Sequence, residues 1–180
     1  MPELTTVGAR RSLRDAPWLP AAVQVLVVLV AFALAGALCG WLWQHLWTPP
    51  QGVVADHVWY TDEEGLRGDF SGTGLYVVIA VLAGFVVGGV TSFFCDRAEL
   101  ATLLAVTAGA ALAAWLMWQV GVHSSPPDPH DVAKTAKDGT KLAGELHVSG
   151  QAPFIAFPVG ALSALAIVFF GLTKRRSRRV

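Results

Sequence analysis

Charged residues are missing from four long stretches of this 180-residue chain. Residues 21–43, 75–95, 100–120 and 154–172 contain no Asp, Glu, Lys or Arg. Each stretch is close to the ~20 residues that a helix needs to cross a hydrocarbon core, and a backbone in lipid must satisfy its own hydrogen bonds. We therefore predict an all-α membrane protein with four transmembrane helices, forming a single domain over residues 1–180, with outer loops at 44–74 and 121–153.

The lack of charge within these stretches argues against a pump or a coupled carrier, because such proteins place ionisable side chains along the translocation path. The polar side chains that remain there are mostly hydroxyls, which can hydrogen-bond back to their own helix. They include Gln24, Thr91, Ser92, Thr102, Thr107 and Ser163.

Catalytic and cofactor-binding motifs are also missing. The chain has no GxSxG, no HExxH and no pair of CxxC motifs, and its glycines lack the strand–turn–helix setting of a phosphate loop. Cys39 and Cys95 are its two cysteines, and their predicted depths at opposite ends of spans place them too far apart for a disulfide. We expect no enzymatic activity and no cofactor.

The net charge of zero hides a segregation of charge by side. Acidic residues dominate the two long loops, whereas Lys and Arg flank the other ends of the spans, which marks that side as cytoplasmic. We predict a multi-pass protein of the cytoplasmic (inner) membrane with both termini in the cytoplasm. The basic tails then meet lipid headgroups, and we expect no nucleic-acid partner. The basic residues are Arg10, Arg11, Arg14, Arg97, Lys174, Arg175, Arg176, Arg178 and Arg179.

Both outer loops contain patterns of regular structure. In the first, β-forming residues at 53–60 and the sequence Asp62-Glu63-Glu64-Gly65 predict a hairpin with its turn at 62–65. In the second, Asp128 resembles a helix N-cap, residues 132–137 fit a short helix closed by Gly139, and residues 141–149 alternate as a strand would. Together the loops predict a small α/β extracytoplasmic cap.

Small residues four positions apart pattern the spans, and such spacing lets helix backbones approach closely in lipid. The neighbour is either another span or another subunit, and we predict a membrane-protein partner or a homo-oligomer in addition to the lipid bilayer. The glycines concerned are Gly36, Gly40, Gly84, Gly88 and Gly109.

Imidazoles and carboxylates gather in the second outer loop. His123, Asp128, His130 and Asp131 lie within nine residues and are the candidate ligands for zinc or another divalent cation. Prolines interrupt the cluster and Asp128 already serves as a cap, so a solvated loop with incidental histidines is the simpler interpretation. All five histidines fall at or beyond the outer face, where sensing of external pH is a further alternative.

The order of these features resembles a family of small four-span actinobacterial membrane proteins catalogued as a domain of unknown function. The resemblance covers residues 25–172 and departs from the family after the third span, where Ser125-Pro126-Pro127 stands in place of Gly-Pro. It implies a four-span protein of the actinobacterial cytoplasmic membrane, and no activity, ligand or catalytic residue. The matching residues are Trp41-Leu42-Trp43, Trp47-Thr48-Pro49, Asp69-Phe70, Asp96-Arg97, Trp118-Gln119-Val120-Gly121, Pro127-Asp128, Ala133, Lys137-Asp138-Gly139 and Phe157-Pro158-Val159.

These observations favour a non-enzymatic accessory or structural subunit of a cell-envelope membrane complex. The alternatives are an oligomeric conduit for ions or small solutes, and an extracytoplasmic metal or pH sensor.

Overall fold

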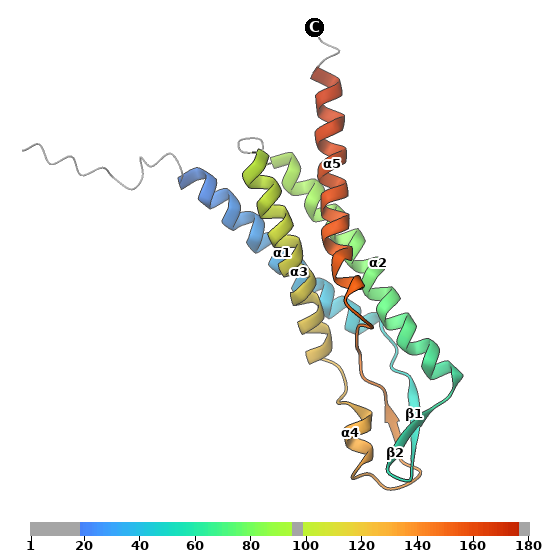
Figure 1. The fold of residues 1–180 in the computed structure, drawn as a ribbon. Coiled ribbons are helices and arrows are strands. Elements are labelled where there is room, and N and C mark those ends of the chain that lie inside the picture. Colours follow the sequence, from blue (N-terminus) through green and yellow to red (C-terminus); the bar gives the residue numbers. More distant parts are fainter. Residues whose placement is uncertain (1–18, 95–98, 177–180) are drawn as a thin grey trace, which may run out of the picture.

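Four long helices dominate the computed structural model, which describes residues 19–94 and 99–176 (Figure 1). They are α1 (Leu19–Leu46), α2 (Glu63–Phe94), α3 (Glu99–His123) and α5 (Ala156–Arg176). Helices α1, α2 and α3 each contain a segment long and apolar enough to cross a membrane, and a fourth such segment runs from Ala152 to Phe170, mostly in α5, so the prediction of four spans is confirmed. Residues 1–18, 95–98 and 177–180 lie outside the described residues, and with them Cys95 and the basic residues Arg10, Arg11, Arg14, Arg97, Arg178 and Arg179.

Helix α2 begins twelve residues before the predicted second span. Asp62 caps it, since its Oδ1 accepts a hydrogen bond of 3.0 Å from the backbone N–H of Gly65. The prediction of a turn at residues 62–65 is therefore wrong, because these residues start the helix. The apolar part of α2 begins later, at Phe70.

The helices pack as two parallel pairs, α1 with α3 and α2 with α5. Helices α1 and α3 both run toward the strands, whereas α2 and α5 run away from them (Figure 1). Gly36 and Gly40 of α1 lie so close to the backbone of Ala113 and Met117 that an added Cβ atom would clash. Close approach of small residues is the usual means of helix association in lipid.

The glycines that were predicted to contact another chain instead contact residues of the same chain. Gly84 and Gly88 of α2 lie against the backbone of Phe157 and Ala161 of α5, and Gly109 of α3 lies against the ring of Phe32. The prediction that Gly36, Gly40, Gly84, Gly88 and Gly109 form an intermolecular interface is corrected accordingly, since each has a neighbour from the same chain at contact distance.

Aromatic side chains join the two pairs. The rings of Phe32 on α1 and Phe157 on α5 lie 6.1 Å apart, and those of Trp43 on α1 and Tyr76 on α2 lie 5.1 Å apart, edge to face. The hydroxyl of Tyr76 donates a hydrogen bond of 2.8 Å to the backbone carbonyl of Ala114 on α3. All four rings are fully buried, so they form the core of the bundle.

Three short strands lie beyond one end of the bundle (Figure 1). They are β1 (Gln51–Ala55), β2 (Val58–Thr61) and β3 (Lys141–Ala143), paired antiparallel in the order β2-β1-β3. We call residues 47–62 and 124–151 the cap, and the adjoining ends of the helices the cap end of the bundle. The first loop thus contains a hairpin, as predicted, although its turn does not lie at residues 62–65, and β1 joins this hairpin to β3 of the second loop.

Several predicted boundaries within the cap are corrected. The hairpin turns at Asp56 and His57, which adopt left-handed φ values of 52° and 61°. The predicted N-cap at Asp128 is confirmed, with Pro129 at the first position of the short helix, but this helix is α4 (Pro129–Ala133) and ends before the predicted residue 137. The predicted strand at 141–149 is reduced to β3, and a 3₁₀ turn at Ala152–Ile155 leads into α5.

Candidate functional site

The cap is the candidate functional site, because it carries three of the five histidines, His57, His130 and His147, and the candidate ligands Asp128 and Asp131. Its sheet is held together by more than strand pairing. The indole Nε1 of Trp59 on β2 donates across β1 to the carbonyl of Leu142 at 3.3 Å. The register continues past β3, where the N–H of Gly144 donates to the carbonyl of Pro50 at 2.7 Å.

The second half of the cap is hydrogen-bonded within itself and to the bundle. The N–H of Leu146 donates to Ser125 Oγ at 2.7 Å, and the N–H of Ser149 donates to Thr73 Oγ1 on α2 at 3.1 Å. The Leu146 side chain is buried in the same core cluster as Trp43 and Trp47. These contacts give the cap a defined position on the bundle.

The two faces of the sheet differ in exposure. Val54 is fully buried and Trp59 is half-buried, whereas Val53, Val58 and Tyr60 are 43%, 45% and 57% exposed. The register places Val53 opposite Tyr60 and Ala55 opposite Val58, so these residues share one face. We call Val53, Ala55, Val58 and Tyr60 the open face of the sheet.

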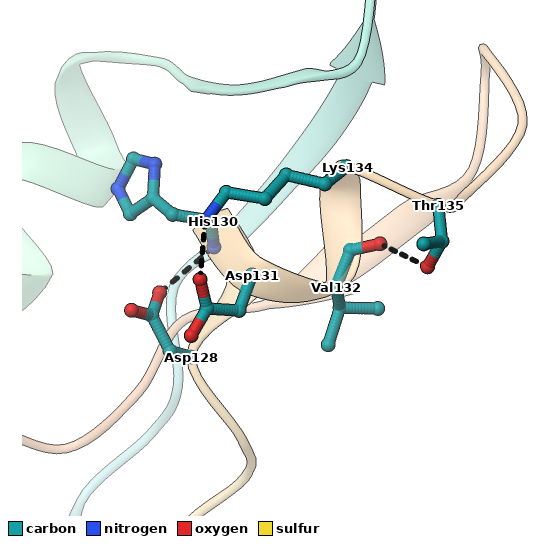
Figure 2. A network of polar contacts seen from close by, with 6 residues as sticks. All are labelled: Asp128, His130, Asp131, Val132, Lys134 and Thr135. Carbon is teal, nitrogen blue, oxygen red and sulfur yellow. Dashed lines mark hydrogen bonds and ion pairs between the residues drawn. The ribbon is translucent and has the colours of Figure 1, made fainter.

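The predicted metal ligands have other partners in the structure. Asp128 Oδ1 accepts a hydrogen bond of 2.8 Å from the N–H of His130, and Asp131 Oδ1 accepts one of 2.6 Å from Lys134 Nζ (Figure 2). The ring of His130 meets the ring of Trp59 edge to face, with centroids 5.4 Å apart. Within residues 19–94 and 99–176 no group of three or more His, Cys, Asp or Glu side chains is arranged to hold a metal ion.

The Asp131–Lys134 pair is fully solvated. The hydrogen bond and the charge of Lys134 lower the pKa of the Asp131 carboxyl, and Asp131 in turn raises the pKa of the Lys134 ammonium. Exposed pairs at this spacing contribute little to stability. We interpret the pair as a feature of the α4 surface and not as part of a reactive centre.

His123, the remaining member of the cluster, is the last residue of α3 and is exposed. His45 lies near the end of α1, where its ring stacks on that of Trp41 with centroids 5.3 Å apart. His57 occupies the hairpin turn. These three histidines are therefore spread over separate elements, and nothing in their geometry points to joint chemistry.

A groove lies between the end of α1 and the part of α2 that is nearest the cap. Its volume is about 450 Å³, and Leu46, Trp47, Thr48, Ser71, Leu75 and Val78 contribute to its lining. Trp47 is buried, and among the described residues its Nε1 has no hydrogen-bond partner.

Sequence reasoning missed both the open face and the groove. The alternation of Val53, Ala55 and Tyr60 with Val54 and Trp59 carried a signal for a two-faced strand, but not for which face is covered. The groove forms where α1 and α2 meet, and no pattern within a single segment of the sequence predicts that contact. No family model, curated protein or solved structure matches this chain.

Proposed function

We propose that this chain is a non-enzymatic accessory subunit of a membrane complex. Four spans anchor it in the bilayer, and the open face of the cap binds the extracytoplasmic part of a partner protein. The location that goes with this proposal is the cytoplasmic membrane, with both chain ends in the cytoplasm. The resemblance to a four-span actinobacterial family agrees with that location.

The observation that carries the proposal is the open face itself. Val53, Val58 and Tyr60 are exposed apolar side chains that lie outside the candidate spans, so hydrocarbon does not cover them. Because contiguous exposed apolar surface often marks a protein or membrane interface, this face needs an occupant.

The charges near the open face favour a protein, and not the membrane surface, as its occupant. The hairpin and the start of α2 carry five acidic side chains against one arginine, and anionic headgroups repel such a segment. A partner with an apolar patch and basic residues at its edge suits the open face better. The charged residues are Asp56, Asp62, Glu63, Glu64, Arg67 and Asp69.

The interior of the bundle favours an anchor over a conduit. Phe32, Tyr76, Met117 and Phe157 are fully buried between the helices. The hydroxyls of Thr91 and Ser92 bond back to carbonyls of their own helix, and Gln24 Nε2 donates to Thr102 Oγ1 at 2.9 Å. The centre of the bundle is filled by large apolar side chains, and these polar groups are already hydrogen-bonded. They are therefore not available to coordinate a permeating ion.

Co-purification from the native membrane in mild detergent tests the proposal. The informative variant is Val58→Ser/Tyr60→Ser, which removes apolar surface from the open face without touching the core. Its matched control is Val58→Ile/Tyr60→Phe, which keeps that surface. We expect a defined partner that the wild type and the control retain and the serine variant loses.

A strictly monomeric protein with no retained partner would contradict the proposal. Equal retention of every co-purifying protein by the two double variants would also contradict it, because binding would then not depend on the open face. Flux of ions or small solutes through proteoliposomes containing the purified chain would favour the conduit instead.

A further inference from the structure

The groove between α1 and α2 lies at membrane depth. Leu46 ends the first candidate span, and Ser71, Leu75 and Val78 lie in the first two turns of the second, Phe70–Phe93. The side chains of Leu46 and Val78 are each 55% exposed. The groove is therefore continuous with the lipid-facing surface of the bundle, and its volume falls in the range of ~300–1,000 Å³ typical of small-molecule sites.

The lining of the groove changes from polar to apolar along its length. Helix α2 starts at the cap and runs into the membrane, so Ser71 lies nearer the cap than Leu75 and Val78. Thr48, which follows the end of α1, adds a second hydroxyl at the cap side. A polar end at headgroup depth and an apolar end beneath it match the chemistry of a lipid ester joined to its acyl chain.

A glycine opens the groove. An added Cβ on Gly74 would meet no atom within 4 Å, whereas the glycines in the helix contacts leave no such space. Gly74 lines the groove and is exposed. The groove thus exists because α2 has no side chain at position 74.

Trp47 lines the groove, whereas its Nε1 is buried near Gly72, which does not line the groove. This donor therefore does not face the groove, and the lipid site does not depend on it.

We propose that this groove binds one acyl chain of a phospholipid from the leaflet on the cap side, with the ester group near Thr48 and Ser71. This lipid site is independent of the partner proposed for the open face. Hydrocarbon is the expected occupant because an apolar groove at this depth excludes water, and an acyl chain is the group that the surrounding leaflet supplies.

Photo-crosslinking in nanodiscs tests the site directly. The probe is phosphatidylethanolamine, whose headgroup has no net charge, with a diazirine in one acyl chain, and labelled peptides are mapped by mass spectrometry. We expect labelling of residues 46–48 and 71–78 to exceed that of the exposed side chains farther along α2, which include Leu82, Phe85, Val86 and Val90. The variant Gly74→Leu fills the groove and should lower that labelling about tenfold, equivalent to the loss of about two methylene contacts.

Val86→Leu is the matched control, since Val86 lies on the lipid-facing side of the same helix outside the groove, and it should leave labelling unchanged. If Gly74→Leu does not fold, Val78→Phe fills the same groove from an exposed position. Equal labelling of wild type and filled variants, or uniform labelling along α2, would overturn the proposal.

Discussion

The hydroxyl of Tyr76 on α2 donates its hydrogen bond to the backbone carbonyl of Ala114 on α3, at 2.8 Å. This bond connects the α2/α5 pair to the α1/α3 pair inside the buried core. The ring that carries the hydroxyl packs against Trp43 and Phe154. Tyr76 therefore acts at the junction of the two pairs, through its ring as well as through its hydroxyl.

Truncations at Tyr76 should separate these two contributions. Tyr76→Phe removes only the hydrogen bond and should cost about 0.6–1 kcal/mol of unfolding free energy. Tyr76→Ala also leaves a cavity and should cost about 3–5 kcal/mol. Unfolding in mixed micelles by added dodecyl sulfate, followed by circular dichroism, measures both. Equal costs for the two variants would show that the ring does not pack in the core.

Adding a methyl group at the helix contacts should destabilise the bundle. Gly36→Ala and Gly84→Ala each place a Cβ against a carbonyl of the neighbouring helix, so the helices must move apart, at a cost of about 1–3 kcal/mol. Gly74→Ala is the control, since its Cβ meets open space and the change adds up to about 1 kcal/mol of helix propensity. The same unfolding assay applies. A similar cost at all three positions would contradict the assigned helix pairs.

Replacing His57 by glycine should stabilise the hairpin. His57 adopts a left-handed φ of 61°, which costs an ordinary residue about 1–2 kcal/mol and glycine almost nothing. We expect hydrogen exchange of the hairpin amides to slow by at least about fivefold in His57→Gly. His57→Ala keeps the strained φ and should show no such slowing. Faster exchange in the glycine variant would place the turn elsewhere.

The carboxyl of Asp131 should titrate below its ordinary pKa of 3.8, because Lys134 stabilises its charged form. A pKa that is lower in the folded protein contributes stability above the unfolded value, and that contribution is lost as the pH falls through the folded value. Since the pair is exposed, the change in melting temperature should be small. Carbon-13 NMR of labelled aspartate follows the titration. Lys134→Met should return the pKa toward 3.8, and an unchanged value would show that the pair does not form.

Zinc should find no dedicated site in the second loop. Asp128 and Asp131 are held by other partners, and His130 packs on Trp59. Calorimetric titration with Zn²⁺ should give the same heats for the wild type and for His123→Ala/His130→Ala. A saturable heat that only the wild type shows would restore the metal sensor as a function.

The sequence was sufficient to predict the features that depend on composition along a single segment. Spans without charge follow from the cost of burying charge in lipid, and the N-cap at Asp128 follows from its own side chain and the proline after it. The pairing of β3 with the first-loop hairpin was also predictable, because both segments had the strand pattern and lay on the same side of the predicted bundle.

The remaining features depend on contacts between distant segments. The two-residue turn at Asp56 and His57 contains no glycine, so its left-handed backbone leaves no compositional signal. The glycine pattern predicted close packing, but only the positions of Ala113, Met117, Phe157 and Ala161 show that the neighbours are helices of the same chain. The open face and the groove likewise arise from how separate elements meet.

The cap should lie across the bilayer from residues 95–98, which connect α2 to α3. The direct measurement uses single cysteines in a Cys39→Ala/Cys95→Ser background and a maleimide that cannot cross membranes. We predict that His57→Cys reacts in intact cells stripped of their wall, and that Arg97→Cys reacts only after the membrane is permeabilised. Reaction of both positions in intact cells, or of Arg97→Cys alone, would contradict the account.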